Sequence, residues 1–289
     1  MAAILAGGHV LIEDIPGVGK TTMAVAFSKS MGLERHRVQF TPDVLPADIV
    51  GFSLYDKQTQ RFVYQPGAVM CNLLLADEIN RTSPKTQSAL LEVMEEGHVT
   101  VDQKTYPVPD PFIVIATENP FGQAGTQMLP ESQLDRFMIC ISMGYPDIHS
   151  EIEIVKGSQK GNPADAVQPA AGREMFLGMR SEVEQIYVHD AVYEYMGRLV
   201  EATRTHPMVR LGISPRGTIA LAKAAKAYAY LEERTFCIPQ DVAEVFPNVA
   251  VHRLFLSPKA RAARMEPSQV IEEILASTPQ PKAGKGKRE

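Results

Sequence analysis

Short apolar runs alternate with amphipathic stretches over the first half of the chain. The runs HVLIE at 9–13, LLLA at 73–76 and FIVIAT at 112–117 are almost wholly apolar, as strands buried on both faces of a sheet are. Between them, 21–31 and 84–96 place apolar residues at helical spacing. Strands that alternate with helices predict the α/β class, with a parallel sheet core and helices on both of its faces.

Two segments interrupt this alternation. Apolar and polar residues alternate along 52–64 and along 99–108, and each segment has turn-forming residues at its centre. This pattern is typical of β-hairpins. We therefore expect two hairpins inserted into the α/β core.

The second half of the chain has helical patterns only, at 190–204, 215–234 and 240–256. Ser214 precedes Pro215, an arrangement that favours the start of a helix. The pattern predicts an all-helical second domain. The expected boundaries are 1–145 for the α/β core, 146–181 for a connector, 182–275 for the helical domain and 276–289 for a disordered basic tail.

Composition narrows the class of protein. The 289 residues are 45% hydrophobic and 22% charged, which is typical of a globular chain, and the net charge of −5 argues against a mainly electrostatic nucleic-acid binder. No apolar run approaches the roughly 20 residues of a membrane span, so we expect no membrane insertion. Three cysteines, Cys71, Cys140 and Cys237, lie far apart and predict neither a disulfide framework nor a metal site. A cytoplasmic location is the expectation.

The segment IPGVGKTT at 15–22 has the composition of a phosphate-binding loop. It follows the first predicted strand and opens the first helix, which is the context such a loop requires. Asp14 stands where the strict motif has glycine, and because aspartate tolerates a left-handed backbone better than most residues, we expect the turn to survive this departure. Lys20 is expected at the β- and γ-phosphates of ATP, and the Thr21 hydroxyl on Mg²⁺. The residues expected to contact the nucleotide are Pro16, Gly17, Val18, Gly19, Lys20, Thr21 and Thr22.

Two carboxylates end the second predicted strand. In nucleoside triphosphatases the first such residue holds Mg²⁺ and the second polarises the attacking water, so we assign Asp77 to the metal and Glu78 to the general base. Asn119, at the end of the third strand, is the candidate for orienting that water. Arg136 and Arg216 carry no specific signal by themselves, because a lone arginine is usually solvated or paired with a nearby carboxylate.

Six motifs in order resemble the MoxR family of AAA+ ATPases. The resemblance rests on IPGVGKTT, LLLADEINR, TQSALLEVMEE, IATENP and LPESQLDRF in the core and on LGISPRGTIALAKAAKAYA in the lid. Both predicted hairpins fit the clade that this family shares with magnesium-chelatase ATPase subunits, which carries an insert in its second helix. Members usually have a further helix and a Gly-Gln segment before the first strand. Since this sequence starts nine residues before Val10, we expect part of the adenine-binding segment to be absent from it.

The resemblance implies a function and a set of roles. It implies an ATP-hydrolysing, Mg²⁺-dependent chaperone that remodels partner proteins, or assists cofactor or metal insertion and the maturation of complexes. The implied partners are further copies in a homo-hexameric ring and proteins with von Willebrand factor A domains. The implied site residues are Lys20 and Thr21 (Walker A), Asp77 and Glu78 (Walker B), Asn119 (sensor 1), Arg136 (an arginine finger for the neighbouring subunit) and Arg216 (sensor 2); Arg81 is a weaker candidate at the subunit interface.

Two alternatives remain open at the level of sequence. A DNA-acting AAA+ motor could use the second hairpin to grip DNA, but 99–108 holds Lys104 as its single lysine or arginine, a poor set of phosphate contacts. A nucleotide-binding scaffold that does not hydrolyse ATP is the other alternative. The presence of Glu78, Asn119 and Arg136 argues against it.

Overall fold

The computed structural model describes residues 1–14, 17–118, 127–158 and 163–281. The chain forms two compact units, one of His9–Met179 and one in which Met1–Gly8 joins Arg180–Glu289. The predicted fold class is confirmed, because the first unit has a parallel sheet with helices and the second is largely helical.

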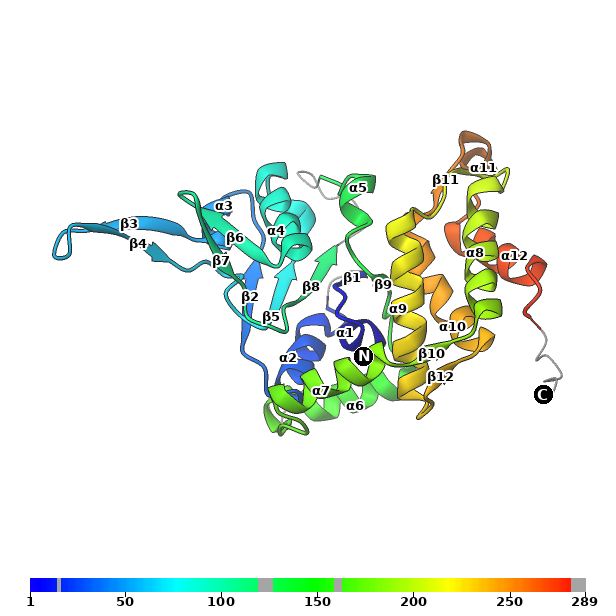
Figure 1. Ribbon diagram of the computed structural model, residues 1–289, viewed down its shortest axis with the longest axis horizontal. Coiled ribbons are helices and arrows are strands. Elements are labelled where there is room, and N and C mark those ends of the chain that lie inside the picture. Colours follow the sequence, from blue (N-terminus) through cyan, green and yellow to red (C-terminus); the bar gives the residue numbers. More distant parts are fainter. Residues whose placement is uncertain (15–16, 119–126, 159–162, 282–289) are drawn as a thin grey trace. The chain divides into compact units, whose positions relative to one another are not determined.

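A five-stranded parallel sheet forms the centre of the first unit (Figure 1). The two strands at its middle, β5 and β8, are buried along their whole length, as their continuous apolar runs predict. Two strands of the sheet, β2 and β9, were not predicted. In sheet order the strands are β2 (Arg35–Gln39), β5 (Leu73–Asp77), β8 (Ile113–Glu118), β1 (Val10–Glu13) and β9 (Ile139–Ile141).

The strand register brings the functional candidates to one edge of the sheet. Gln39 pairs with Asp77 between β2 and β5, and Glu13 pairs with Glu118 between β1 and β8. All five strands run in the same direction, so their carboxyl ends meet there. Helix α2 (Lys20–Ser30) begins just after β1 at this same edge.

Both predicted hairpins are present. Strands β3 (Phe52–Asp56) and β4 (Arg61–Gln65) form the first, which projects from the rest of its unit in Figure 1, and β6 (His98–Val101) and β7 (Lys104–Pro107) form the second. Helix α4 (Pro84–Glu96) leads directly into β6 and lies against α3 (Pro46–Val50), which precedes β3.

Shorter elements complete the first unit. They are the 3-10 helices η1 (Ile79–Arg81) and η2 (Pro163–Ala166) and the helices α5 (Glu131–Leu134) and α6 (Ile148–Ser158), and helix α7 (Arg173–Glu184) runs from this unit into the next.

The second unit is built around α9 (Pro215–Leu231). This helix packs against α10 (Pro239–Ala250), α8 (Asp190–Thr205) and the short α1 (Ala2–Leu5), which explains why the first residues of the chain group with this unit. The remaining elements are the two-stranded sheets β10 (Tyr187–Val188) with β12 (Phe236–Cys237) and β11 (Val209–Leu211) with β13 (Phe255–Leu256), the 3-10 helix η3 (Val251–Arg253), and the helices α11 (Pro258–Ala262) and α12 (Pro267–Ser277).

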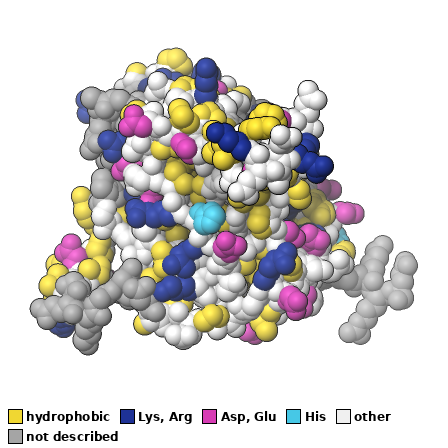
Figure 2. Space-filling view, turned by 90° about the vertical axis from the view of Figure 1, so that its left-hand side faces the viewer, with side chains coloured by type: hydrophobic (Ala, Val, Ile, Leu, Met, Phe, Trp, Pro, Cys, Tyr) yellow, Lys and Arg dark blue, Asp and Glu magenta, His cyan; other side chains and the backbone are white. Residues whose placement is uncertain are grey.

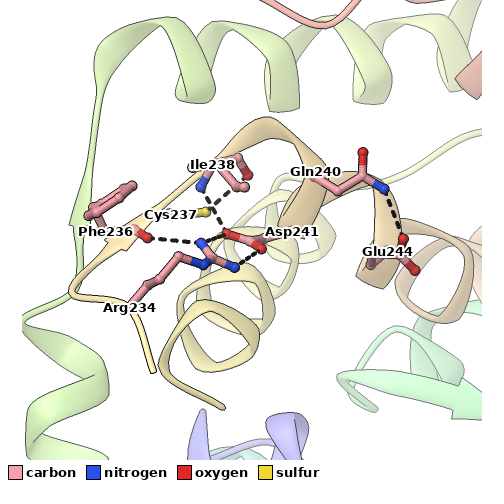
Figure 3. Close-up of polar contacts among 7 residues, drawn as sticks. All are labelled: Arg234, Phe236, Cys237, Ile238, Gln240, Asp241 and Glu244. Carbon is pink, nitrogen blue, oxygen red and sulfur yellow. Dashed lines mark hydrogen bonds and ion pairs between the residues drawn. The ribbon is translucent and has the colours of Figure 1, made fainter. Parts of the chain in front are cut away.

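An ion pair fixes the start of α10. Both nitrogens at the end of the Arg234 guanidinium donate to the carboxylate of Asp241, and that carboxylate also accepts a hydrogen bond from the backbone N–H of Ile238 at 2.8 Å (Figure 3). The Asp241 side chain is 2% exposed. The buried charge is thus compensated by a bidentate partner and by the first turn of the helix. None of the described helices is both long and apolar enough to cross a membrane.

Candidate functional site

The loop before α2 has the conformation of an anion-binding turn. Gly17 and Gly19 have φ of 89° and 90°, a region that side chains rarely adopt, and a Cβ at either position would meet no atom within 4 Å. Gly19 is the N-cap of α2 and offers no side chain to the free N–H groups of the first turn. These N–H groups and the helix dipole favour a phosphate there. Val18 and Thr22 lie in the same loop and turn, whereas the predicted contact residue Pro16 lies outside the described residues.

Asp14 does not use the left-handed backbone that aspartate tolerates, since it is not among the non-glycine residues with positive φ. Its carboxylate instead accepts hydrogen bonds from the backbone N–H groups of Met143 (2.5 Å) and Gly144 (3.0 Å). The side chain therefore ties the phosphate loop to the segment after β9. The Asp14 carbonyl also accepts a hydrogen bond from Nζ of Lys20 at 2.9 Å.

Thr21 and Asp77 lie side by side. The Thr21 hydroxyl donates to Oδ2 of Asp77 at 3.5 Å, and Nε of Arg37 on β2 donates to the same oxygen at 2.7 Å. A hydroxyl and a carboxylate are the hard oxygen donors that Mg²⁺ prefers when substrate phosphates and water supply the other ligands. The pair therefore fits that ion. In the described part of the chain no group of three or more His, Cys, Asp or Glu side chains could hold a metal without such a substrate.

Glu78 follows Asp77 in an uncommon backbone conformation, with φ of 55° and ψ of 50°. Its backbone N–H donates to Oγ1 of Thr117 on β8 at 2.9 Å. Its carboxylate oxygen Oε2 accepts hydrogen bonds from Gln39 on β2 and from Arg81 on η1, both at 2.8 Å. Two donors therefore hold the carboxylate of the predicted base.

Glu13 and Glu118 form a second carboxylate pair, at the carboxyl ends of β1 and β8. Glu118 is 3% exposed, and its Oε1 has no hydrogen-bond partner among the described residues. Burial, with the nearby charge of Glu13, raises the pKa of Glu118 to about 8; burial also raises the pKa of Glu13. These residues are neighbours in the register of β1 and β8, so this pair favours a bound proton near neutral pH.

Arg136 and Arg216 come from other elements of the chain. Arg136, just after α5, has its guanidinium 3.1 Å from the carboxylate of Glu95 on α4. Arg216 is exposed in the first turn of α9, where the Ser214 hydroxyl accepts a hydrogen bond from Gly217 at 3.1 Å. Arg216 belongs to the second unit and the phosphate loop to the first. Asn119 lies outside the described residues.

Sequence reasoning missed three residues that contact the carboxylates of Asp77 and Glu78. Arg37 and Gln39 are on β2, whose residues 35–39 alternate between exposed and half-buried positions. That period of two in RHRVQ was the available signal. Thr117 was noted as part of a strand end, but the hydrogen bonds of its hydroxyl to Asp77 and Glu78 had no signal in the sequence.

Comparisons with known proteins agree with this geometry. Residues 9–139 match the ATPase family associated with various cellular activities (AAA), and residues 201–274 match the AAA lid domain. The chain is 48% identical to the uncharacterized protein YeaC of Bacillus subtilis, covering 97% of this chain and 88% of that protein. It is 40% identical to the chaperone MoxR1 of Mycobacterium tuberculosis, covering 97% of this chain and 76% of that one. A crystal structure from Cytophaga hutchinsonii, described as a "putative ATPase", superposes with a TM-score of 0.90 at 38% identity and covers 97% of this chain and 88% of that chain.

Proposed function

The chain belongs to the MoxR-related AAA ATPases, and on that premise we propose that it hydrolyses ATP to remodel partner proteins. One observation carries this proposal: the Thr21 hydroxyl, in the first turn of α2, donates to the carboxylate of Asp77 at the carboxyl end of β5, and Glu78 follows Asp77 directly. A phosphate held by the α2 turn would then face a metal-binding pair and a carboxylate base.

The chain's own residues have distinct parts in the proposed reaction. Backbone N–H groups at 17–20 and the Lys20 ammonium would hold the phosphates. Thr21 and Asp77 would hold Mg²⁺, which when bound would supply positive charge at the phosphate oxygens. Glu78 accepts the proton of the attacking water. Gln39 and Arg81 both donate to Oε2 of Glu78, so this oxygen can accept a proton from water only after one of these donors has left.

The wider role is part of the same proposal. We infer that copies of the chain form a homo-hexameric ring in which Arg136 of one subunit serves the ATP site of the next, while Arg216 and Asn119 respond to the bound nucleotide. Partners of this ring include proteins with von Willebrand factor A domains, and the ring assists cofactor or metal insertion into enzyme complexes and their maturation. The three free cysteines support the cytoplasm as its location.

The test is ATP turnover by the full chain and by Glu78→Gln. The amide keeps the shape of the side chain but does not accept a proton, so turnover falls about 10²- to 10⁴-fold while MgATP binding stays. Glu92→Gln, an exposed glutamate on α4, is the matched control and keeps full turnover. Turnover above about a tenth of wild type in Glu78→Gln would exclude Glu78 as the base.

A further inference from the structure

The β3–β4 hairpin exposes large hydrophobic side chains on both of its faces. Leu54 (56% exposed) lies opposite Val63 (42%), and Tyr55 (48%) lies opposite Phe62 (68%), with the two rings in edge-to-face contact. Because side chains alternate between faces, the aliphatic pair and the aromatic pair lie on opposite sides of the hairpin. A two-stranded hairpin is marginally stable in water, and a patch exposed in this way marks an interaction surface.

The outer edges of this hairpin are open. Within the described residues, β3 and β4 pair only with each other. Sheet edges are usually protected from further pairing by charged residues or proline, but 52–55 and 62–65 contain neither. The outward N–H and C=O groups are therefore available to a further strand.

The charges of the hairpin gather at its turn. The Asp56 carboxylate accepts hydrogen bonds from the Thr59 hydroxyl (2.7 Å) and from the backbone N–H of Gln58 (2.8 Å), which lower the pKa of Asp56 and satisfy its charge locally. Lys57 and Arg61 are exposed, and neither forms an ion pair with the residues that the structure describes. The turn end of the hairpin therefore attracts negative charge, whereas residues 52–55 and 62–65 of the two strands are uncharged. Figure 2, drawn from the side on which the hairpin projects, shows hydrophobic side chains among lysines and arginines on that face.

The base of the hairpin is held firmly. The Tyr64 hydroxyl donates to the carbonyl of Val50 at 2.6 Å, and its ring stacks on Tyr106 of the second hairpin, with 4.1 Å between ring centroids. A Cβ at Gly51 would lie 2.3 Å from the carbonyl oxygen of Gln65, so no side chain fits at residue 51, just before β3 begins. The hairpin also lies between β2 and β5 in the chain, the strands that carry Gln39 and Asp77.

We propose that the β3–β4 hairpin binds extended apolar segments of partner proteins that have acidic residues beside them. The segment adds as a third strand to an open edge, its apolar side chains cover Leu54 and Val63 or Tyr55 and Phe62, and its acidic end lies at Lys57 and Arg61. The inference rests on the proposed function in that the bound segment belongs to the protein that is remodelled.

The probe is a fluorescein-labelled synthetic peptide, DDTVTFTVT, titrated with the full-length protein and followed by fluorescence anisotropy. Two further peptides carry N-methyl groups on alternate residues, one in each register, and a fourth has lysines in place of the two aspartates. We expect N-methylation in one register to weaken binding at least tenfold, because it removes the N–H donors of the added strand, and in the other register to have little effect. The lysine peptide binds at least fivefold more weakly.

Protein variants give an independent test. Leu54→Ser with Phe62→Ser weakens peptide binding at least tenfold, whereas Ile219→Ser, a control at an exposed hydrophobic residue (59% exposed) on α9 in the other unit, changes it less than twofold. The proposal is overturned if the parent peptide does not bind, if both N-methylated peptides bind as the parent does, or if the control loses as much as the double variant. It is also overturned if the double variant dissociates on a sizing column, since the hairpin then contacts a second copy of the chain.

ATP turnover of the same preparations separates the two proposals. Turnover without peptide binding refutes the role of the hairpin alone. Peptide binding without turnover refutes the ATPase proposal alone.

Discussion

The side-chain amide of Gln39 donates a hydrogen bond of 2.8 Å to Oε2 of Glu78, from the strand next to the one that Glu78 follows. Arg81 donates to the same oxygen at the same distance. An oxygen that accepts two hydrogen bonds has no free lone pair for water until one of the donors leaves. The contact therefore restrains the predicted base.

Gln39→Ala should raise basal ATP turnover. A hydrogen bond to a charged group contributes about 1.5–3 kcal/mol, and release of part of this amount corresponds to about a three- to tenfold gain. Steady-state phosphate release measures the rate. Arg35→Ala, an exposed change on the same face of β2, is the control. A rate that falls instead would show that the contact places Glu78 for reaction.

If Arg136 acts on a neighbouring subunit, Arg136→Ala should lower the ATP turnover rate by about 10³- to 10⁵-fold and leave ATP binding unchanged. Lys20→Ala is inactive for a different reason, the loss of phosphate binding. Mixing the two inactive variants then restores activity, because some interfaces combine an intact loop with an intact arginine. Sizing first establishes that mixed oligomers form.

The structure supplies the competing explanation for Arg136. Its ion pair with Glu95 joins the α5 segment to α4. If that pair is all the arginine provides, Arg136→Ala lowers the melting temperature, Glu95→Gln does so too, and mixing with Lys20→Ala restores nothing.

Glu118→Gln should change the pH dependence of stability. The pKa of Glu118 is raised to about 8 in the folded protein, above its ordinary value of 4.5. The proton that the folded protein holds on Glu118 therefore contributes fully to the free energy of unfolding below about pH 4.5. This contribution is lost as the pH rises to about 8, by about 1.4 kcal/mol per pH unit. The glutamine does not titrate, so the free energy of unfolding of the variant relative to wild type rises across this window. Denaturant unfolding at several pH values measures it, and a constant difference would contradict the shift.

Arg234→Met should destabilise the helical unit by about 3–5 kcal/mol, because it leaves the Asp241 carboxylate buried without its cation. Adding Asp241→Leu should recover a large part of the loss. Lys223→Met, an exposed change on α9, is the control and is expected to be neutral. Chemical unfolding followed by helix content gives the values; an unchanged midpoint for Arg234→Met would show that the pair adds nothing.

The sequence predicts best the elements whose signals are local. Helix α4 was expected at 84–96 and has those bounds, because Ser83 caps its first turn, accepting a hydrogen bond from Thr86, and Gly97 ends it with φ of 68°. The 240–256 helix is shorter than expected. It ends as α10 at Ala250, and a 3-10 turn and a short strand follow.

The contacts that tune the site could not be predicted in this way. Glu78 meets Gln39 from 39 residues away, and Asp14 meets the backbone of Met143 from 129 residues away. Such pairs depend on strand order and on an uncommon turn at Glu78, and periodicity reports neither. Polar motifs therefore predict which residues act, and the fold shows which residues contact them.

The stack of Tyr64 on Tyr106 has a consequence for protein engineering. The two inserts are 42 residues apart at this contact, yet each provides half of one aromatic interface. A chimera that receives one insert from a relative would bring together two rings selected in different proteins. Exchange of both hairpins together, with Gly51, keeps the Tyr64–Tyr106 contact intact. We expect libraries of chimeras to yield stable proteins mainly when the two hairpins are exchanged as a pair.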